Sequence, residues 1–268
     1  MKKIIIPAVS ALLIILFLGK CSHGTGLRMA TTTSVENSGL LDALIPAFKR
    51  ETGIEIHAVA CGTGRALKLA ENGDVDLVLT HAPAAEEKFL MRGFGIIRKE
   101  IFYNDFIVAG PEDGIQAFKG FKNISQVFAV IAEDKLPFVS RGDKSGTHNR
   151  ETDVWKSAGV APRGKWYVET GQGMGATLRI ADEKKGFCLA DRGTFLSYED
   201  KIDLVIVFSD RENLKNMYSV IIVNPGRHPH TRYGAAVKFL GWITSKEGKR
   251  IIISVKKKGE TLFRPVAL

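Results

Sequence analysis

The sequence predicts an α/β fold with two lobes and two strands that cross between them. Strands and helices alternate over residues 27–92, a pattern typical of a parallel sheet covered by helices on both faces. The alternation ends at Gly110-Pro111 and then begins again, which indicates a second α/β unit. Apolar strands at residues 103–110 and 218–224 are placed to pass between the two units. Two crossing strands make a hinge, and a hinge makes a cleft.

The elements of the first lobe follow from apolar spacing and from glycines that close helices. Leu40, Leu44 and Phe48 fall on one helical face, and Gly53 ends that helix. The expected elements are a strand at 27–30, this helix after Ser38, a strand at 54–60, a helix at 65–72, a strand at 75–80 and a helix at 84–92.

The same signals predict the second lobe and the end of the chain. The expected elements are a strand at 102–109, a helix near 123–127, strands at 138–139 and near 166–169, helices at 147–158 and 175–185, strands at 187–190, 204–208 and 218–223, and helices near 231–244 and 246–254, which finish the chain. We expect residues 27–105 and 220–268 to form lobe 1, and residues 106–219 to form lobe 2.

The first twenty residues predict a signal peptide. A basic start precedes an uncharged run over residues 4–18, which is shorter than the roughly 20 residues of a membrane span. An uncleaved anchor is the alternative. Leu-Gly-Lys-Cys at residues 18–21 resembles a bacterial lipobox, although Lys20 replaces the usual small residue. We expect a signal peptide over 1–20, lipidation of Cys21, a tether over 21–26, and a location in the periplasm or on the outer face of the cytoplasmic membrane.

Composition narrows the class of protein. The 268 residues are 45% hydrophobic and 25% charged, which is ordinary for a globular protein and excludes a disordered chain or a multi-span membrane protein. The net charge of +9 favours anionic partners. The sequence has no basic stripe with interleaved aromatic residues, so it does not indicate a nucleic-acid partner. Cys61 and Cys188 could pair after export, but their assignment to different lobes favours two unpaired, mostly buried thiols.

Three short segments share one design for binding an anion. Each follows a strand and enters a helix with hydroxyl and small residues: Thr32-Thr33-Ser34, Gly62-Thr63-Gly64 and Ser145-Gly146-Thr147. The free N–H groups and the dipole at a helix start attract negative charge. Helix capping is the alternative for each segment alone. Because ligands of open α/β sheets bind at the carboxyl ends of strands, the three segments together favour an anion site.

Arg141 could supply positive charge to this site. It lies four residues before Ser145, where its guanidinium could donate charge-assisted hydrogen bonds to an oxyanion. A surface pair with Asp143 is the alternative. Gly173, Met174 and Gly175 could line the cleft through their backbone amides.

Catalytic and cofactor motifs are not found in the sequence. It contains no Gly-x-x-x-x-Gly-Lys-Ser/Thr, His-Glu-x-x-His or Gly-x-Ser-x-Gly pattern. We therefore expect no enzyme activity, no resident metal cation and no cofactor. His81 and His148 neighbour the proposed segments, and both fit structural or rim positions better than ligand positions. Asp191 begins a segment, through Thr194, that could hold the hinge or rim by an ion pair.

At these residues the chain resembles a known family, the tungstate-binding substrate-binding proteins of ABC importers. The resemblance covers most of residues 29–225 and is most specific at Thr-Thr-Thr-Ser, residues 31–34, and Ser-Arg-Gly-Asp, residues 140–143. It implies a two-lobed periplasmic-binding-protein fold of type II and capture of tungstate for a permease and its ATPase. By motif position, the resemblance implies as ligand-binding candidates Thr32, Thr33, Thr63, Arg141, Ser145 and Thr147, followed by Ser34, Gly64, Gly146, Gly173, Met174 and Gly175.

Oxyanion chemistry leaves several functions open. Tungstate and molybdate carry no proton near neutral pH, so their sites need only donors, whereas phosphate keeps a proton and benefits from a carboxylate acceptor. The proposed segments favour tungstate, molybdate or sulfate. An enzyme on the same fold and a sensor ectodomain with a membrane partner are the alternatives. We expect a monomer.

Overall fold

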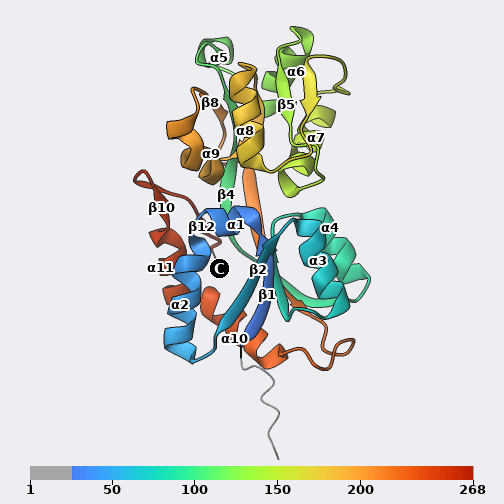
Figure 1. The fold of residues 1–268 in the computed structure, drawn as a ribbon, viewed down its shortest axis with the longest axis vertical. Helices are drawn as coiled ribbons and strands as arrows, with labels where there is room; N and C mark the ends of the chain where they lie inside the picture. Colours follow the sequence, from blue (N-terminus) through green and yellow to red (C-terminus); the bar gives the residue numbers. More distant parts are fainter. Residues whose placement is uncertain (1–25, 268) are drawn as a thin grey trace, which may run out of the picture.

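The protein consists of two lobes stacked along its longest axis (Figure 1), which confirms the predicted fold class. The structure, a computed structural model, describes residues 26–267. The predicted signal peptide and Cys21 lie outside the described residues, as does the tether except for Gly26. Within the described range, no helix has the length and apolar character needed to cross a membrane.

A mixed sheet forms the centre of lobe 1. Three parallel strands occupy one side, in the order β3 (Leu77–Thr80), β1 (Leu27–Thr32) and β2 (Ile56–Cys61). β9 (Lys215–Val223) pairs antiparallel with β3 and with β4 (Gly95–Gly110). The short strand β12 (Arg264–Pro265) pairs with the outer side of β4. The parallel order places the ends of β1 and β2, with Thr32 and Cys61, side by side.

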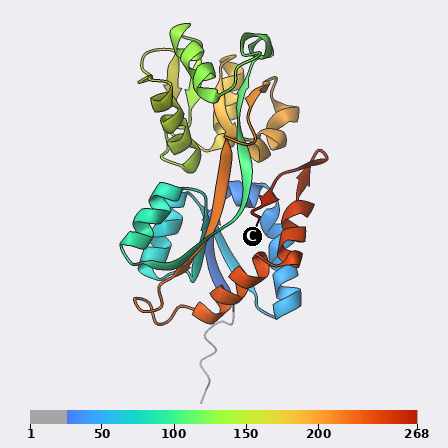
Figure 2. The ribbon, with the colours of Figure 1, turned by 180° about the vertical axis from the view of Figure 1, so that it is seen from behind.

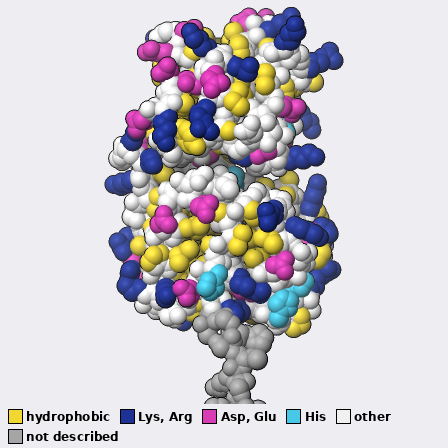
Figure 3. Space-filling view, in the orientation of Figure 1, with side chains coloured by type: hydrophobic (Ala, Val, Ile, Leu, Met, Phe, Trp, Pro, Cys, Tyr) yellow, Lys and Arg dark blue, Asp and Glu magenta, His cyan; other side chains and the backbone are white. Residues whose placement is uncertain are grey.

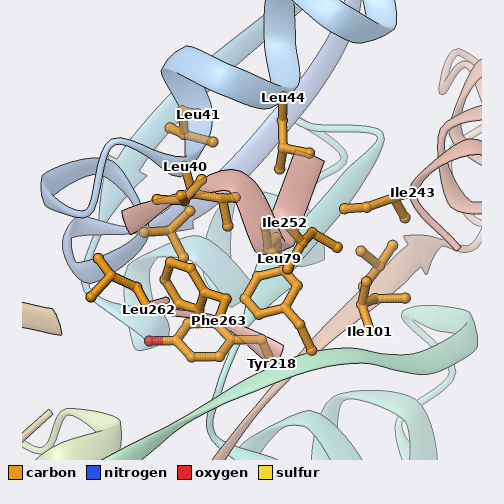
Figure 4. Close-up of a cluster of buried hydrophobic side chains, with 14 of the residues drawn as sticks. Leu40, Leu41, Leu44, Leu79, Ile101, Tyr218, Ile243, Ile252, Leu262 and Phe263 are labelled. Atoms are coloured by element: carbon orange, nitrogen blue, oxygen red, sulfur yellow. The ribbon is translucent and has the colours of Figure 1, made fainter. Parts of the chain in front are cut away.

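Helices cover both faces of this sheet. The helices of lobe 1 are α1 (Thr33–Asn37), α2 (Leu40–Thr52), α3 (Thr63–Asn72), α4 (Pro83–Met91), α10 (Tyr233–Ile243) and α11 (Lys246–Ser254). On one face, Leu40, Leu44, Ile243 and Ile252 pack with Tyr218 of β9 (Figure 4). A separate apolar cluster joins the sheet to α3 and α4. A hairpin of β10 (Lys256–Lys257) and β11 (Glu260–Thr261) follows α11.

Lobe 2 is built around the second half of β4. There β4 pairs antiparallel with β7 (Cys188–Asp191) and β8 (Val205–Ser209), while β5 (Phe138–Ser140) pairs in parallel with β6 (Tyr167–Glu169). The other elements are α5 (Gly114–Ala117), α6 (Ile124–Glu133), α7 (Gly146–Ser157), α8 (Met174–Glu183), α9 (Arg192–Tyr198) and the 3₁₀ helix η1 (Glu199–Lys201). Phe128, Phe138 and Trp155 pack together in its core.

Two strands connect the lobes, as the rear view shows (Figure 2). β4 pairs with β9 in lobe 1 and, from Phe106 onward, with β7 and β8 in lobe 2. β9 crosses at its first residues, because Leu214 packs in the lobe 2 core while Lys215 already pairs with Asp105. The crossing predicted at 218–224 is therefore wrong by a few residues, since that segment lies inside the lobe 1 sheet. The lobe bounds given above stay a prediction.

Three further sequence expectations differ from the structure. β4 begins at Gly95, whereas the sequence predicts a strand from residue 102. The predicted strand starts too late because Arg98, Lys99 and Glu100 break the apolar pattern in the half-exposed first part of β4. α6 continues to Glu133, well beyond residue 127. The chain does not finish with helices, since β10, β11 and β12 follow α11; these strands of two residues each carry no periodic signal.

Candidate functional site

Two predicted donors of lobe 1 lie at the carboxyl ends of adjacent strands. Thr32 ends β1 and precedes α1, and Thr63 begins α3 after β2. Both threonines are buried, with exposed fractions of 3% and 5%. Neither α1 nor α3 has a side-chain cap, so the N–H groups of their first turns remain available to a ligand. Thr33 and Gly64 are exposed, and Ser34 is half-buried.

The corresponding helix start in lobe 2 is already capped. Ser145 Oγ accepts a hydrogen bond of 3.3 Å from the backbone N–H of His148, so the capping alternative holds for this residue. Thr147, two residues further on, is only 1% exposed and makes no such bond. The two hydroxyls therefore differ, because Ser145 Oγ stabilises its own helix and the Thr147 hydroxyl has no partner in the part of the chain that the structure describes.

Arg141 is buried beside this helix start. Its guanidinium donates a 2.5 Å hydrogen bond from one Nη to Asp143 Oδ2, while Asp143 Oδ1 accepts from the backbone N–H of Ser145. Burial raises the pKa of the Asp143 carboxyl, but the Ser145 hydrogen bonds and the Arg141 charge outweigh burial and hold that pKa below its usual value. The predicted pair with Asp143 thus exists, but Arg141 is only 7% exposed. The pair with Asp143 engages one Nη of the guanidinium.

Three buried donor atoms in these segments lack a hydrogen-bond partner within residues 26–267. They are Thr32 Oγ1 in lobe 1 and Arg141 Nε and Thr147 Oγ1 in lobe 2. A buried polar atom without a partner costs about 1–3 kcal/mol, so such atoms are rare in folded proteins. Only Arg150 Nε and Ser219 Oγ share this property in the described chain. Of these five atoms, two belong to the segments predicted from sequence to bind an anion, and a third belongs to Arg141, the residue predicted to supply their charge.

A cavity of about 270 Å³ lies between the lobes next to Arg141. It brings together predicted residues from both lobes, namely Thr33, Ser34, Arg141, Gly173, Met174 and Gly175. Thr32, Thr63, Gly64, Ser145, Gly146 and Thr147 are not in its lining. The space-filling view shows the furrow between the lobes, with side chains of both charges on either side (Figure 3).

Three residues of this cavity carry no signal in the sequence, namely Asn37, Ala176 and Tyr198, and Thr194 was expected only within a segment at the hinge or rim. Thr194 and Tyr198 come from α9, a short helix that the apolar pattern did not reveal. The Tyr198 hydroxyl packs closely against Gly175, because a Cβ added to Gly175 would stand 2.1 Å from that hydroxyl. Gly175 therefore lets that hydroxyl approach the start of α8.

The acidic groups near the cavity are occupied by protein donors. Asp191 caps α9 by accepting from the N–H and the hydroxyl of Thr194. Arg192 donates to both oxygens of Asp105 on the crossing strand β4, at 2.7–3.1 Å. The segment that begins at Asp191 thus forms the ion pair expected from sequence, and that pair lies at the hinge.

The cysteines and histidines match a structural role. Cys61 in lobe 1 and Cys188 in lobe 2 are buried and free, as expected, and burial raises the pKa of both thiols. In a turn, the Nε2 atoms of His228 and His230 donate to the backbone oxygens of Glu71 and Gly73. Among residues 26–267, no group of three or more His, Cys, Asp or Glu side chains is arranged to hold a metal ion.

Fold and site together define a two-lobed protein that presents hydrogen-bond donors to an anion across a hinged cleft. The comparisons with known proteins agree with this class. Residues 22–247 match the family model described as PBP superfamily domain. The chain belongs to this superfamily, and within it to the family of the tungstate-binding proteins described next.

Two relatives and one solved structure show how close the similarity is. The tungstate-binding protein TupA of Campylobacter jejuni is 44% identical over 235 residues, which cover 86% of this chain and 87% of the relative. TupA of Peptoclostridium acidaminophilum is 43% identical over 243 residues, covering 89% and 85%. The structure of TupA from Desulfovibrio alaskensis G20 superposes with a TM-score of 0.81 at 44% identity, covering 90% of this chain and 99% of that one. The family resemblance seen in the sequence is confirmed.

Proposed function

We propose that the protein captures tungstate in the cleft between its lobes and delivers it to the permease and ATPase of an ABC importer. Relatives over 40% identical across most of the chain are tungstate-binding proteins, which supports the choice of cargo. The observation that carries the proposal is the set of three buried, unpartnered donors, Thr32 Oγ1, Arg141 Nε and Thr147 Oγ1. A bound oxyanion would satisfy all three.

The proposed division of roles follows the chemistry of each group. Arg141 supplies the positive charge, and the neutral hydroxyl donors are Thr32, Thr33, Thr63, Ser145 and Thr147. Backbone N–H groups at the helix starts complete the site, at Ser34, Gly64, Gly146, Gly173, Met174 and Gly175. Closing the lobes would place this set around one dianion.

The donor set favours a fully deprotonated oxyanion over phosphate. Asp143, the nearest carboxylate in sequence, already accepts from Arg141 and Ser145, and its lowered pKa keeps it ionised and unable to donate a proton. A protonated phosphate therefore finds no carboxylate among these residues that is free of protein donors. Tungstate, molybdate and sulfate need none.

Export and a monomeric state complete the proposal. The signal peptide over 1–20 would place the mature chain in the periplasm or on the outer face of the cytoplasmic membrane, with Cys21 as a lipid anchor. Neither catalysis nor a cofactor is needed for capture and delivery. Mass spectrometry of the mature N-terminus tests the anchor: a diacylglycerol-modified Cys21 supports it, and an unmodified start downstream of Cys21 contradicts it.

Calorimetry with an oxyanion panel tests the proposed cargo. We expect tight binding of tungstate and of molybdate, with no heat from phosphate. A ligand at about 1,000 times its Kd adds about 4 kcal/mol of stability, so tungstate should also raise the Tm clearly. Tighter binding of phosphate than of tungstate would overturn the proposal.

A further inference from the structure

One tight contact between the two lobes lies at the start of α7, next to the candidate site. His81 follows β3 in lobe 1, and Gly146 is the first residue of α7 in lobe 2. A Cβ on Gly146 would stand 2.9 Å from His81 Cε1, from His81 Nδ1 and from the His81 backbone oxygen. Real Cβ atoms essentially never come this close to other atoms. Only glycine therefore allows this approach of α7 to lobe 1.

The His81 ring is held rigidly by the two crossing strands. Its Nδ1 lies 2.9 Å from Asn216 Oδ1, and its ring stacks on Tyr218 with centroids 4.6 Å apart. Asn216 Nδ2 in turn donates to Asn104 Oδ1 at 2.8 Å and to the Tyr218 hydroxyl at 3.2 Å. Asn216 and Tyr218 belong to β9 and Asn104 belongs to β4, so the ring is tied to both hinge strands.

Burial also favours a neutral His81 ring. Desolvation lowers the pKa of this imidazole, and Arg141 adds to the effect, while the Asn216 hydrogen bond and the charges of Asp191 and Glu86 oppose it. A neutral ring suits its position, because the first turn of α7 presents the positive end of the helix dipole. A charged ring there would repel both the helix end and Arg141.

We propose that His81 is a positioning residue that seats the start of α7 against lobe 1 when the cleft closes. Through this seat, the hinge strands position the segment from Arg141 to Thr147, which carries the side-chain donors proposed for lobe 2. The effect on ligand affinity rests on the proposed function. The seat is the contact between Gly146 of lobe 2 and His81 of lobe 1. Because it joins the two lobes, it can be measured without ligand.

Gly146→Ala is the variant that blocks the seat. The added methyl group meets the His81 backbone oxygen, and no rotation of the imidazole can remove that clash. The hinge can relieve it by opening, so we expect an unchanged Tm for the ligand-free protein. The Kd for tungstate should rise roughly ten- to a hundredfold, the range expected for an overpacked contact. Gly234→Ala is the matched control, since Gly234 lies in the first turn of α10 with no atom within 4 Å of an added Cβ.

The distance between the lobes gives a readout independent of the ligand. Nitroxide labels at Lys88→Cys on α4 and Lys156→Cys on α7, both exposed, report this distance by double electron–electron resonance in a Cys21→Ser background. Cys61 and Cys188 are buried and should not be labelled. Gly146→Ala should shift the distribution of label-to-label distances to larger values. His81→Ala should broaden this distribution. His81→Asn keeps the donor to Asn216 and should broaden the distribution less.

Each result bears on the seat or on the function separately. Unchanged distances in Gly146→Ala would overturn the seat, and so would a ligand-free Tm that falls in this variant but not in Gly234→Ala. If the wild type binds no tungstate while the distances shift as expected, the proposed function fails and the seat stands. If tungstate binds and the distances do not shift, the function stands and the seat fails.

Discussion

In the proposed site, the two lobes would offer an anion different kinds of donor. In lobe 1, Thr32 and Thr63 stand at helix starts without side-chain caps and contribute neutral hydroxyl and N–H groups. In lobe 2, Ser145 caps α7, and Arg141 brings a formal charge whose orientation is held by Asp143. In the proposed site, this difference would place the charge in a prearranged lobe 2, and lobe 1 would add dipoles on closure of the cleft. Removing the lobe 2 charge should therefore lower the affinity for the anion more than removing any lobe 1 hydroxyl.

Arg141→Ala should have the largest effect. A dianion in a closed cleft needs compensating charge, and a charge-assisted hydrogen bond is worth about 1.5–3 kcal/mol, so affinity for tungstate should fall at least ten- to a hundredfold by calorimetry. Arg163→Ala, at an exposed position of the same lobe, should bind as the wild type does. If Arg141→Ala binds normally while Thr63→Ala abolishes binding, the roles of the lobes are reversed.

Arg141→Lys should have the next largest effect and shows whether charge or geometry matters more. Lysine keeps the charge but loses the planar fork that can span two oxygens. We expect partial recovery relative to Arg141→Ala and a changed ratio of the tungstate and molybdate Kd values. Full recovery with an unchanged ratio would show that only charge matters.

Removal of single hydroxyls should cost less. Thr32→Val and Thr147→Val each delete one neutral donor, worth about 0.5–1.5 kcal/mol, so each Kd should rise roughly two- to tenfold. Because both hydroxyls lack a partner among residues 26–267, the Tm of the ligand-free protein should stay equal or rise. Thr31→Val is the contrasting control: Thr31 Oγ1 donates to the Leu79 backbone oxygen, so its loss should lower the Tm and spare affinity. A lower ligand-free Tm in Thr32→Val would contradict an unpartnered hydroxyl.

Glu151→Gln should have the smallest effect on affinity but should change how stability depends on pH. Burial raises the pKa of this α7 carboxyl to about 7, against the hydrogen bonds from Tyr167 and Trp155. The folded protein therefore retains a proton that the unfolded chain releases near pH 4.5. The contribution of Glu151 to the free energy of unfolding is therefore largest below pH 4.5. It falls as the pH rises toward 7, by up to roughly 3 kcal/mol.

Thermal unfolding at two pH values checks this sign. Glu151→Gln stays neutral, so its Tm should exceed that of the wild type at pH 8 and match it at pH 5. The Kd for tungstate at pH 8 should be unchanged. An equal Tm difference at both pH values would show that the carboxyl is not protonated in the fold.

The sequence predicts the core elements well and the marginal ones poorly. α3 and α11 match their expected positions because apolar spacing and terminal glycine or serine residues mark them. α9 was missed because its seven residues, Arg192–Tyr198, are too few to show a helical period. β12 was missed because it is held by pairing with β4, a contact distant in sequence.

The site divides in the same way. The sequence predicts the strand-to-helix segments, since glycines and hydroxyls mark them locally, and the buried unpartnered atoms of Thr32, Arg141 and Thr147 are consistent with that prediction. Tyr198 and Thr194 reach the cavity only because α9 packs against α8 and β4. For His81, the sequence predicts only a position next to a proposed segment. Its role is not visible there because its partners Asn216 and Tyr218 lie more than a hundred residues away in the chain.

A crystal structure with tungstate, phased at the tungsten absorption edge, tests the central claim most directly. Tungsten scatters strongly, so one anomalous peak locates the ligand without ambiguity. We predict this peak between the lobes, with oxyanion oxygens within hydrogen-bond distance of Thr32 Oγ1, Arg141 Nε and Thr147 Oγ1. A peak away from these three atoms, such as at Phe106, Lys215 and Met217 in the neighbouring cavity that His81 and Gly146 also line, would contradict the account even if calorimetry showed tight binding.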